Sequence, residues 1–157
     1  GLNAYNESII SDKVIDKIEL EGVGKLLALT SNDEVNSMGV LHFSEIFEKE
    51  TLYQLQPATK EDEREYSPQH LRGRFLFGKN ITYDHITKRT REGAAIKSTN
   101  ITEKFTFEDF KKKHGESAIP LFLITSARKL IPFTSVDKII PEKGSIIIAL
   151  INPAGQF

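Results

Sequence analysis

The chain has 157 residues, of which 39% are hydrophobic and 27% charged, and its formal net charge at pH 7 is -1. This composition fits a soluble globular protein with one sizeable core or two small ones. The absence of Cys excludes disulfides, thiolate metal sites and Cys nucleophiles. No apolar run approaches the roughly 20 residues that cross a bilayer, and we identify no signal peptide.

The same helix-start signal occurs three times along the chain. It consists of an apolar residue, a Ser or Thr cap, and a second apolar residue five positions after the first. The three sets are Ile10, Ser11 and Ile15; Ile81, Thr82 and Ile86; and Phe105, Thr106 and Phe110. We expect the first helix to continue through Ile18, and the other two to end at Gly93 and Gly115.

A fourth and longer helix is predicted immediately after an apolar run at residues 25–30. Ser31 and Glu34 have the spacing of a capping box, which places the helix start at Ser31. The expected apolar positions of this helix are Val35, Met38, Leu41, Ile46 and Phe47.

Short apolar runs between the helices predict strands at residues 25–30, 51–55, 74–77, 95–101, 120–125, 129–133 and 145–151. Alternating helices and strands indicate an α/β or α+β fold. Near the C-terminus, "TSARK" and "PEKG" read as turns between the strands of a meander. We therefore expect a mixed or antiparallel C-terminal sheet with two helices.

Residues 56–68, "QPATKEDEREYSP", have no periodicity and contain six charges and two prolines, as expected for a linker. They divide the chain into a domain at residues 1–55 and an α+β domain at 69–157. The first domain reads strand fragment, helix, strand, helix, strand, which is the order of the second half of a Rossmann-like domain. The predicted class is α/β, with a truncated Rossmann-like half followed by a small α+β domain.

The charges are unevenly distributed along the chain. Residues 1–68 hold 6 Lys/Arg and 14 Asp/Glu, whereas residues 69–97 hold 7 and 2. The basic block could bind a phosphate, an acidic lipid surface or nucleic acid, or it could be a solvated face that balances the acidic half. The candidate anion ligands are Arg72, Arg74, Arg89 and Arg91, together with Lys88. The aromatic residues among them read as core positions, so we do not expect nucleic acid as a partner.

Patterns typical of catalysis are missing from the sequence. The four His residues are more than ten positions apart, which does not support a zinc site. No GxSxG elbow is present, and the acidic run in the linker reads as solvated. We expect neither an enzyme nor a metal centre.

Several segments resemble a known family. The run "ALTSNDEVN" followed by "VLHF" is similar to the TrkA-type (RCK-like) regulator-of-conductance domain. Further segments resemble the C-terminal region of bacterial monovalent cation:proton antiporters of the sodium/hydrogen exchanger type: "LRGRFLFG" (71–78), "TYDHITKRTREGAAIKSTNIT" (82–102), "PLFLIT" (120–125) and "PEKGSIIIAL" (141–150). The resemblance extends over nearly the whole chain.

The resemblance implies a regulatory domain on the cytoplasmic side of the membrane, whose partner is its own transmembrane transporter domain. It also implies a homodimer and a nucleotide, either NAD or an adenine nucleotide, in the full-length protein. The family's glycine loop and acidic ribose ligand have no counterpart here, so any nucleotide site within this chain is incomplete.

The predicted ligand site is the junction between strand 25–30 and the helix after it. In open α/β sheets, ligands bind beyond the carboxyl ends of the strands. The residues expected there are Thr30, Ser31, Asn32 and Asp33, together with Asn6 and Glu7 after the first strand fragment. Because Asp33 would repel a phosphate, we expect contact with ribose or adenine. In the alternative interpretation, Ser31 only caps the helix and Asn36 is exposed.

Two other functions remain open at this point. One is a stand-alone binding module for an anionic ligand, and the other is a fragment of a Rossmann-fold enzyme. For the truncated half, the open sheet edge predicts self-association.

Overall fold

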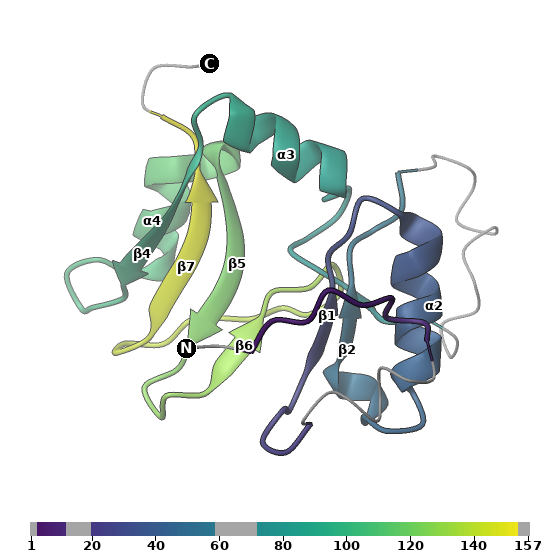
Figure 1. Ribbon diagram of the computed structural model, residues 1–157. Coiled ribbons are helices and arrows are strands. Elements are labelled where there is room, and N and C mark those ends of the chain that lie inside the picture. The colour runs from purple at the N-terminus through teal and green to yellow at the C-terminus, as the bar shows by residue number, and fades with distance from the viewer. Residues whose placement is uncertain (1–2, 12–19, 59–71, 154–157) are drawn as a thin grey trace. The chain divides into compact units, whose positions relative to one another are not determined.

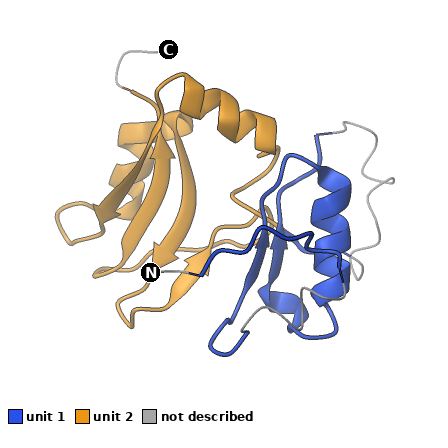
Figure 2. Cartoon of the chain, viewed as in Figure 1, with its two compact units in different colours: residues 1–74 blue, residues 75–157 orange. Residues whose placement is uncertain are grey.

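The computed structural model describes residues 3–11, 20–58 and 72–153 (Figure 1). The chain forms two compact units, unit 1 (residues 1–74) and unit 2 (residues 75–157), shown in separate colours in Figure 2. The first expected helix falls at residues 12–19, and most of the expected linker falls at 59–71, so both lie outside the described residues. None of the helices in the described parts of the chain is long and apolar enough to cross a bilayer.

Unit 1 is built on a β-α-β arrangement. Strand β1 (Leu26–Ala28) leads into helix α2 (Asp33–Phe43), and a 3-10 turn (Lys49–Thr51) precedes strand β2 (Leu52–Gln54). β1 and β2 pair in parallel, from Leu26 opposite Leu52 to Ala28 opposite Gln54. A short third strand, β3 (Arg74–Phe75), completes the sheet in the order β1-β2-β3. The described segment 3–11 contains no strand, so the expected first strand fragment is wrong for those residues.

Helix α2 differs from its prediction in both start and register. Its N-cap is Asn32 instead of Ser31, and it ends at Phe43, before Ile46 and Phe47. Met38 and Leu41 are 51% and 52% exposed. The buried positions are instead spaced i, i+3, i+4 and i+7, which is one face of a helix: Asn36, Gly39, Val40 and Phe43.

The small core of unit 1 forms between this helix face and the sheet. Val40 and Phe43 pack with Leu52, and Ile9, Leu20, Leu26, Ala28 and Phe47 add partly buried contacts. Gly39 lets the N-terminal segment approach, because a Cβ there would lie 3.4 Å from Ile9 Cγ2. Gly73 packs tightly against β2. A Cβ added at Gly73 would lie 3.1 Å from the carbonyl carbon of Tyr53 and 3.2 Å from the backbone N of Gln54.

Unit 2 contains a four-stranded antiparallel sheet in the order β4-β7-β5-β6. The strands are β4 (Ala95–Asn100), β5 (Ala118–Ile124), β6 (Leu130–Pro132) and β7 (Ile146–Ile151). The expected antiparallel C-terminal sheet is therefore confirmed, with strand positions close to those predicted. The expected meander is wrong, because β7 lies between β4 and β5 and is not a neighbour of β6. The pairing of β5 with β7 is irregular between Pro120 and Phe122, whereas β4 pairs with β7 without a register shift.

Both predicted caps of unit 2 are confirmed. Helix α3 (Tyr83–Arg91) begins after Thr82, whose side chain accepts a hydrogen bond from the backbone N–H of His85. Helix α4 (Phe107–His114) begins after Thr106, which forms a full capping box with Asp109. The chain leaves α4 at Gly115, where φ is +48°. A 3-10 turn (Gly115–Ser117) then leads into β5.

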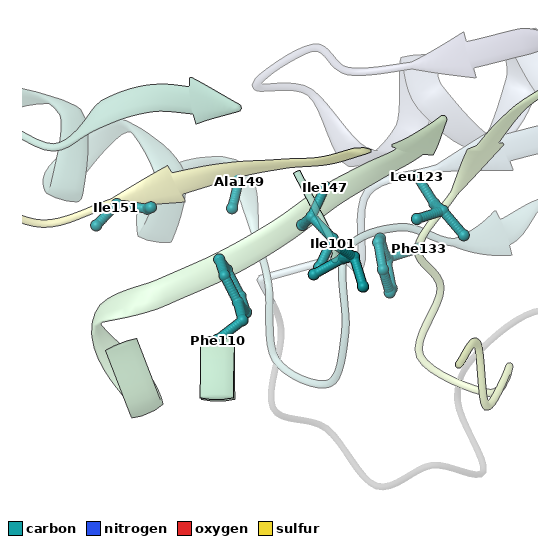
Figure 3. Close-up of a cluster of buried hydrophobic side chains, with 7 residues drawn as sticks. All are labelled: Ile101, Phe110, Leu123, Phe133, Ile147, Ala149 and Ile151. Carbon is teal, nitrogen blue, oxygen red and sulfur yellow. The ribbon is translucent and has the colours of Figure 1, made fainter. Parts of the chain in front are cut away.

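Helix α4 covers one face of the sheet and encloses an apolar core (Figures 1 and 3). Phe110 projects from α4 toward β5 and β7 and stacks against Phe107 at 6.2 Å between ring centroids. The fully buried members of this cluster are Ile101, Phe110, Leu123, Phe133, Ile147, Ala149 and Ile151. The apolar "SIIIALI" run is thus the central strand β7, which packs on both faces of the sheet.

Candidate functional site

The carboxyl ends of β1 and β2 meet at the first turn of α2. The backbone N–H of Leu55, just after β2, donates to the carbonyl oxygen of Ala28 at the end of β1, at 3.1 Å. In a parallel α/β arrangement this is the edge at which ligands bind. We call this region the carboxyl edge and define it by Thr30, Asn32, Asp33, Asn36 and Ala58.

Thr30 and Asn36 form the most extensive polar contact at the carboxyl edge. The Asn36 side-chain oxygen accepts hydrogen bonds from Thr30 N at 2.9 Å and Thr30 Oγ1 at 2.8 Å. The Asn36 amide nitrogen donates to the Thr30 carbonyl oxygen at 2.9 Å. Asn36 is only 1% exposed, so these bonds replace water around a buried amide. The interpretation of Asn36 as an exposed residue is therefore wrong.

The first turn of α2 is held by two further side chains. Asn32 Oδ1 accepts from the backbone N–H of Val35 at 3.0 Å, which is the N-cap interaction. Asp33 Oδ2 accepts from the backbone N–H of Ala58 at 2.9 Å and thereby fixes the segment that follows β2. The carboxylate also lies at the positive end of the helix dipole, which attracts its negative charge. Both strand-to-loop junctions are thus connected to the same helix start.

The structure brings only some of the predicted ligand residues together. Thr30, Asn32 and Asp33 lie at the carboxyl edge, and Ser31 lies between them as an exposed residue. Asn6 and Glu7 are exposed in a segment without strand structure, so they do not follow a strand end as expected.

The chemistry of the carboxyl edge favours hydroxyl and amine donors over anions. Asp33 retains a second carboxylate oxygen, whereas the hydroxyl of Thr30 already donates to Asn36 Oδ1 and accepts from the backbone N–H of Asn32. A carboxylate beside a phosphate would be repelled, whereas it can accept hydrogen bonds from the hydroxyls of a ribose. The geometry is therefore consistent with the expected contact to ribose or adenine.

The predicted anion ligands are divided between the two units. In unit 1, the Arg74 guanidinium lies over the Tyr53 ring at 5.6 Å from its centroid. In unit 2, Arg89 is 9% exposed and points inward, where its Nε donates to Asn152 Oδ1 at 2.8 Å and its Nη2 to the Glu116 carbonyl at 3.1 Å. Arg89 therefore holds α3 onto the ends of β5 and β7, and it is wrong as a ligand for an external anion.

Arg91 is exposed on the outer side of α3, beside a shallow depression. Its neighbours there carry both signs of charge, and Lys88 lies 4.0 Å from Glu92. The lining residues are Tyr83, Asp84, Thr87, Lys88, Arg91 and Glu92. Because two carboxylates offset the two cations, this surface has no net attraction for a polyanion. Arg72 is partly buried in unit 1, outside the helix that carries Arg91.

His42 and His114 each contact a Phe ring, whereas His85 is exposed on α3. His42 meets the Phe43 ring edge-on, with 5.5 Å between centroids. Partial desolvation, together with the charges of Arg89 and Lys88, lowers the pKa of His85. Burial, together with Lys113 and Lys97, likewise lowers the pKa of His114. In the described residues, no group of three or more His, Asp or Glu side chains is arranged to hold a metal ion.

Three buried polar contacts were missed by sequence reasoning. Besides Asn36, the Gln54 side chain is 1% exposed, accepts from Gly73 N at 2.9 Å and donates to Ser37 Oγ at 3.3 Å. Asn152 supplies the acceptor for Arg89. The contacts join residues that are between 6 and 63 positions apart, and no local motif marks any of them.

Searches with this chain found no matching family model, no similar curated protein and no similar solved structure.

Proposed function

We propose that this chain is a cytoplasmic regulatory region of a cation:proton antiporter, in which unit 1 is half of a Rossmann-like domain that contributes to a nucleotide site. Support comes first from the resemblance of four segments to antiporter C-terminal regions. It comes second from the parallel β1-α2-β2 arrangement, whose polar carboxyl edge is where such a domain would hold a ribose.

Some residues in the segments that carry the resemblance have specific structural roles. Gly73 of "LRGRFLFG" has the close approach to β2, and Phe77 of the same segment has a left-handed backbone with φ of +67°. Thr82 of "TYDHIT" is the N-cap of α3. A shared segment with a geometric requirement is a stronger basis for a family proposal than a shared apolar pattern.

Regulation in this proposal is a coupling between ligand binding and the conformation of the attached transporter. Such coupling requires a ligand that binds two conformations with different affinity, typically by about 1–3 kcal/mol. Asp33 is suited to transmit such a difference, because its carboxylate already joins the start of α2 to the segment after β2. A ribose hydroxyl bound to Asp33 would change the contact with Ala58.

Backbone NMR of the 157-residue chain, titrated with NAD, AMP and inorganic phosphate, tests the ligand assignment. We expect NAD and AMP, up to millimolar concentrations, to shift the amides of Thr30, Asn32, Asp33 and Ala58, because these line the carboxyl edge. Phosphate should leave them unchanged because of the Asp33 charge.

Asp33→Ala should remove the response to AMP, and Lys138→Gln, at an exposed position in unit 2, is the matched control. Shifts confined to α3, or no shifts with either nucleotide, would overturn the assignment of this edge as a ribose site.

A further inference from the structure

Strand β4 forms an open edge of the sheet in unit 2. It is the terminal strand in the order β4-β7-β5-β6, and within the described residues no strand pairs with its outer side (Figure 1). All six of its residues pair with β7 in unbroken register, from Ala95 opposite Ile151 to Asn100 opposite Ile146. Five of the six are exposed, including Ile96 at 68%.

The backbone groups that face outward can be assigned from the neighbouring hydrogen bonds. Ile101 N donates to Ser145 O at 2.8 Å, and Asn152 N donates to Ser117 O at 3.0 Å. In an antiparallel ladder the N–H and C=O groups of successive residues point to opposite sides. Odd-numbered β4 residues therefore face β7, and the outward N–H and C=O groups belong to Ile96, Ser98 and Asn100.

The other terminal strand of this sheet, β6, lacks these properties. It has three residues and ends at Pro132, which has no N–H to offer. Short edge strands and prolines are common protections against pairing between chains. β4 has neither a proline nor a bulge, and Lys97 is its one charged residue. An edge of this length and regularity is a template for another strand.

We propose that the β4 edge pairs antiparallel with the β4 edge of a second copy of this chain, about a two-fold axis at Ser98. In this register Ser98 faces its own counterpart, and Ile96 faces Asn100 of the partner strand. Each of these three residue pairs can exchange two backbone hydrogen bonds, giving about six in total. A second copy satisfies this edge fully, because two identical antiparallel strands bring the same three outward-facing residues opposite one another about Ser98.

The charge on Lys97 selects this register over its neighbour. Moving the axis to Lys97 would place two lysines directly opposite each other, and like charges at such positions are destabilising. With the axis at Ser98, Lys97 instead faces Thr99 of the partner strand, and all three outward-facing residues are paired. Some lysine repulsion remains across the axis, so the dimer should strengthen as salt screens it.

This interface does not depend on the proposed transport function or on a nucleotide. It is also distinct from the edge of β1, which has three residues and lies in unit 1. A chain that dimerises through β4 without binding AMP would support the interface and count against the ligand site. A chain that binds AMP but stays monomeric would support the ligand site and count against the interface.

Sedimentation equilibrium of the wild-type chain and two proline variants tests the proposal. Ser98→Pro removes an outward N–H and keeps every β4 N–H that faces β7, so we expect a folded protein whose dimer dissociation constant rises at least tenfold. Thr99→Pro removes an inward N–H and should disrupt the β4–β7 ladder itself. Hydrogen exchange of the β7 amides checks that Ser98→Pro remains folded.

A cysteine variant provides the second readout, since the native chain has no Cys. Ser98→Cys should form an intermolecular disulfide under mild oxidation, because facing residues in a hydrogen-bonded pair lie about 5.5 Å apart at Cα. Leu130→Cys on the β6 edge, where the side chain is 46% exposed, is the matched control and should cross-link far less. A monomer at millimolar concentration, or equal cross-linking at the two positions, would overturn the proposal.

Discussion

The two units use different interactions to hold a helix against a sheet. In unit 1, α2 buries two apolar side chains, Val40 and Phe43, beside the amide of Asn36, and the adjacent strand buries the amide of Gln54. In unit 2, α4 sits on a cluster of seven buried apolar residues that contains no polar side chain. Apolar burial is tolerant of small shifts, whereas buried amides require specific partners. Hydrogen bonds of buried amides therefore fix α2 in unit 1, whereas in unit 2 apolar contacts hold α4 and the hydrogen bonds of Arg89 hold α3.

This difference matters for the location of the candidate site. A polar edge that must present side chains to a ligand needs those side chains to be fixed, and buried hydrogen bonds fix them. The Asn36 side chain holds the backbone of Thr30, which is the first of the predicted ligand residues at this junction. The apolar core of unit 2 instead supports a regular sheet with a long free edge.

The largest expected effect is the loss of the α4 anchor in unit 2. Phe110→Ala should reduce the free energy of unfolding by about 3–5 kcal/mol, because it removes a side chain that is 2% exposed and leaves a cavity. Hydrogen exchange of the β7 amides measures this effect. Val136→Ala, at a position 71% exposed, is the control and should change little. A small effect of Phe110→Ala would mean that unit 2 is not held by this cluster.

A smaller loss is expected from removing the buried amide in unit 1. Asn36→Leu keeps the side-chain volume but leaves the N–H and C=O of Thr30 without their partner, which should cost about 1–3 kcal/mol. Exchange of the β2 amides reports on unit 1, and Glu34→Gln on the exposed side of the same helix is the control. A neutral or stabilising Asn36→Leu would show that apolar packing alone suffices in unit 1, as in unit 2.

The smallest effect concerns the titration of His114 at the end of α4. Its pKa lies below the ordinary value of 6.5 because of burial first, and then because of Lys113 and Lys97. The unfolded chain therefore binds the proton more readily than the folded one. The stability contribution of His114 is present above pH 6.5 and is lost as the pH falls through the lowered pKa.

Removing Lys97 tests whether its charge contributes to the lowered pKa of His114. Lys97→Gln should raise the pKa of His114, which stays below 6.5 because burial remains, as followed by NMR of the imidazole protons. Lys138→Gln should leave the pKa where it is. An unchanged pKa in Lys97→Gln would show that the charge of Lys97 does not act on His114.

Local signals in the sequence predicted the elements of unit 2 well. Thr82 and Thr106 mark helix starts through contacts within three residues, and such contacts depend little on the rest of the fold. The apolar runs of β5 and β7 likewise indicated buried strands. The short turn at "TSARK" indicated the antiparallel pairing of β5 with β6, whereas β7 pairs with β4 and β5 and not with β6, the strand before it.

The register of α2 could not be predicted in the same way. Its apolar residues Met38 and Leu41 suggested one face, but the face that packs contains Asn36 and Gly39. Asn36 is buried because Thr30 satisfies its amide, and Gly39 is buried because Ile9 approaches it. Both reasons depend on tertiary contacts. Ser31 and Asn32 are neighbours and both residue types are good N-caps, so the sequence alone does not decide which of them starts the helix.

The candidate site was predicted only where it follows directly from a strand end. Thr30, Asn32 and Asp33 were identified because they lie between a strand and a helix, and this order fixes their position in a parallel unit. The contact from Asp33 to Ala58 spans 25 residues and has no sequence signal. Arg89 was misassigned because a basic residue in a charged block gives no indication that it points inward.

The most direct test of the proposed function is cation-dependent proton flux across vesicles that contain the full-length gene product. We predict that the vesicles exchange cations for protons and that adding AMP or NAD to the side bearing this region changes the rate. We also predict that Asp33→Ala abolishes this change. A gene product without exchange activity, or a rate that is the same with and without nucleotide, would contradict the assignment of this chain as a ligand-responsive regulator of an antiporter.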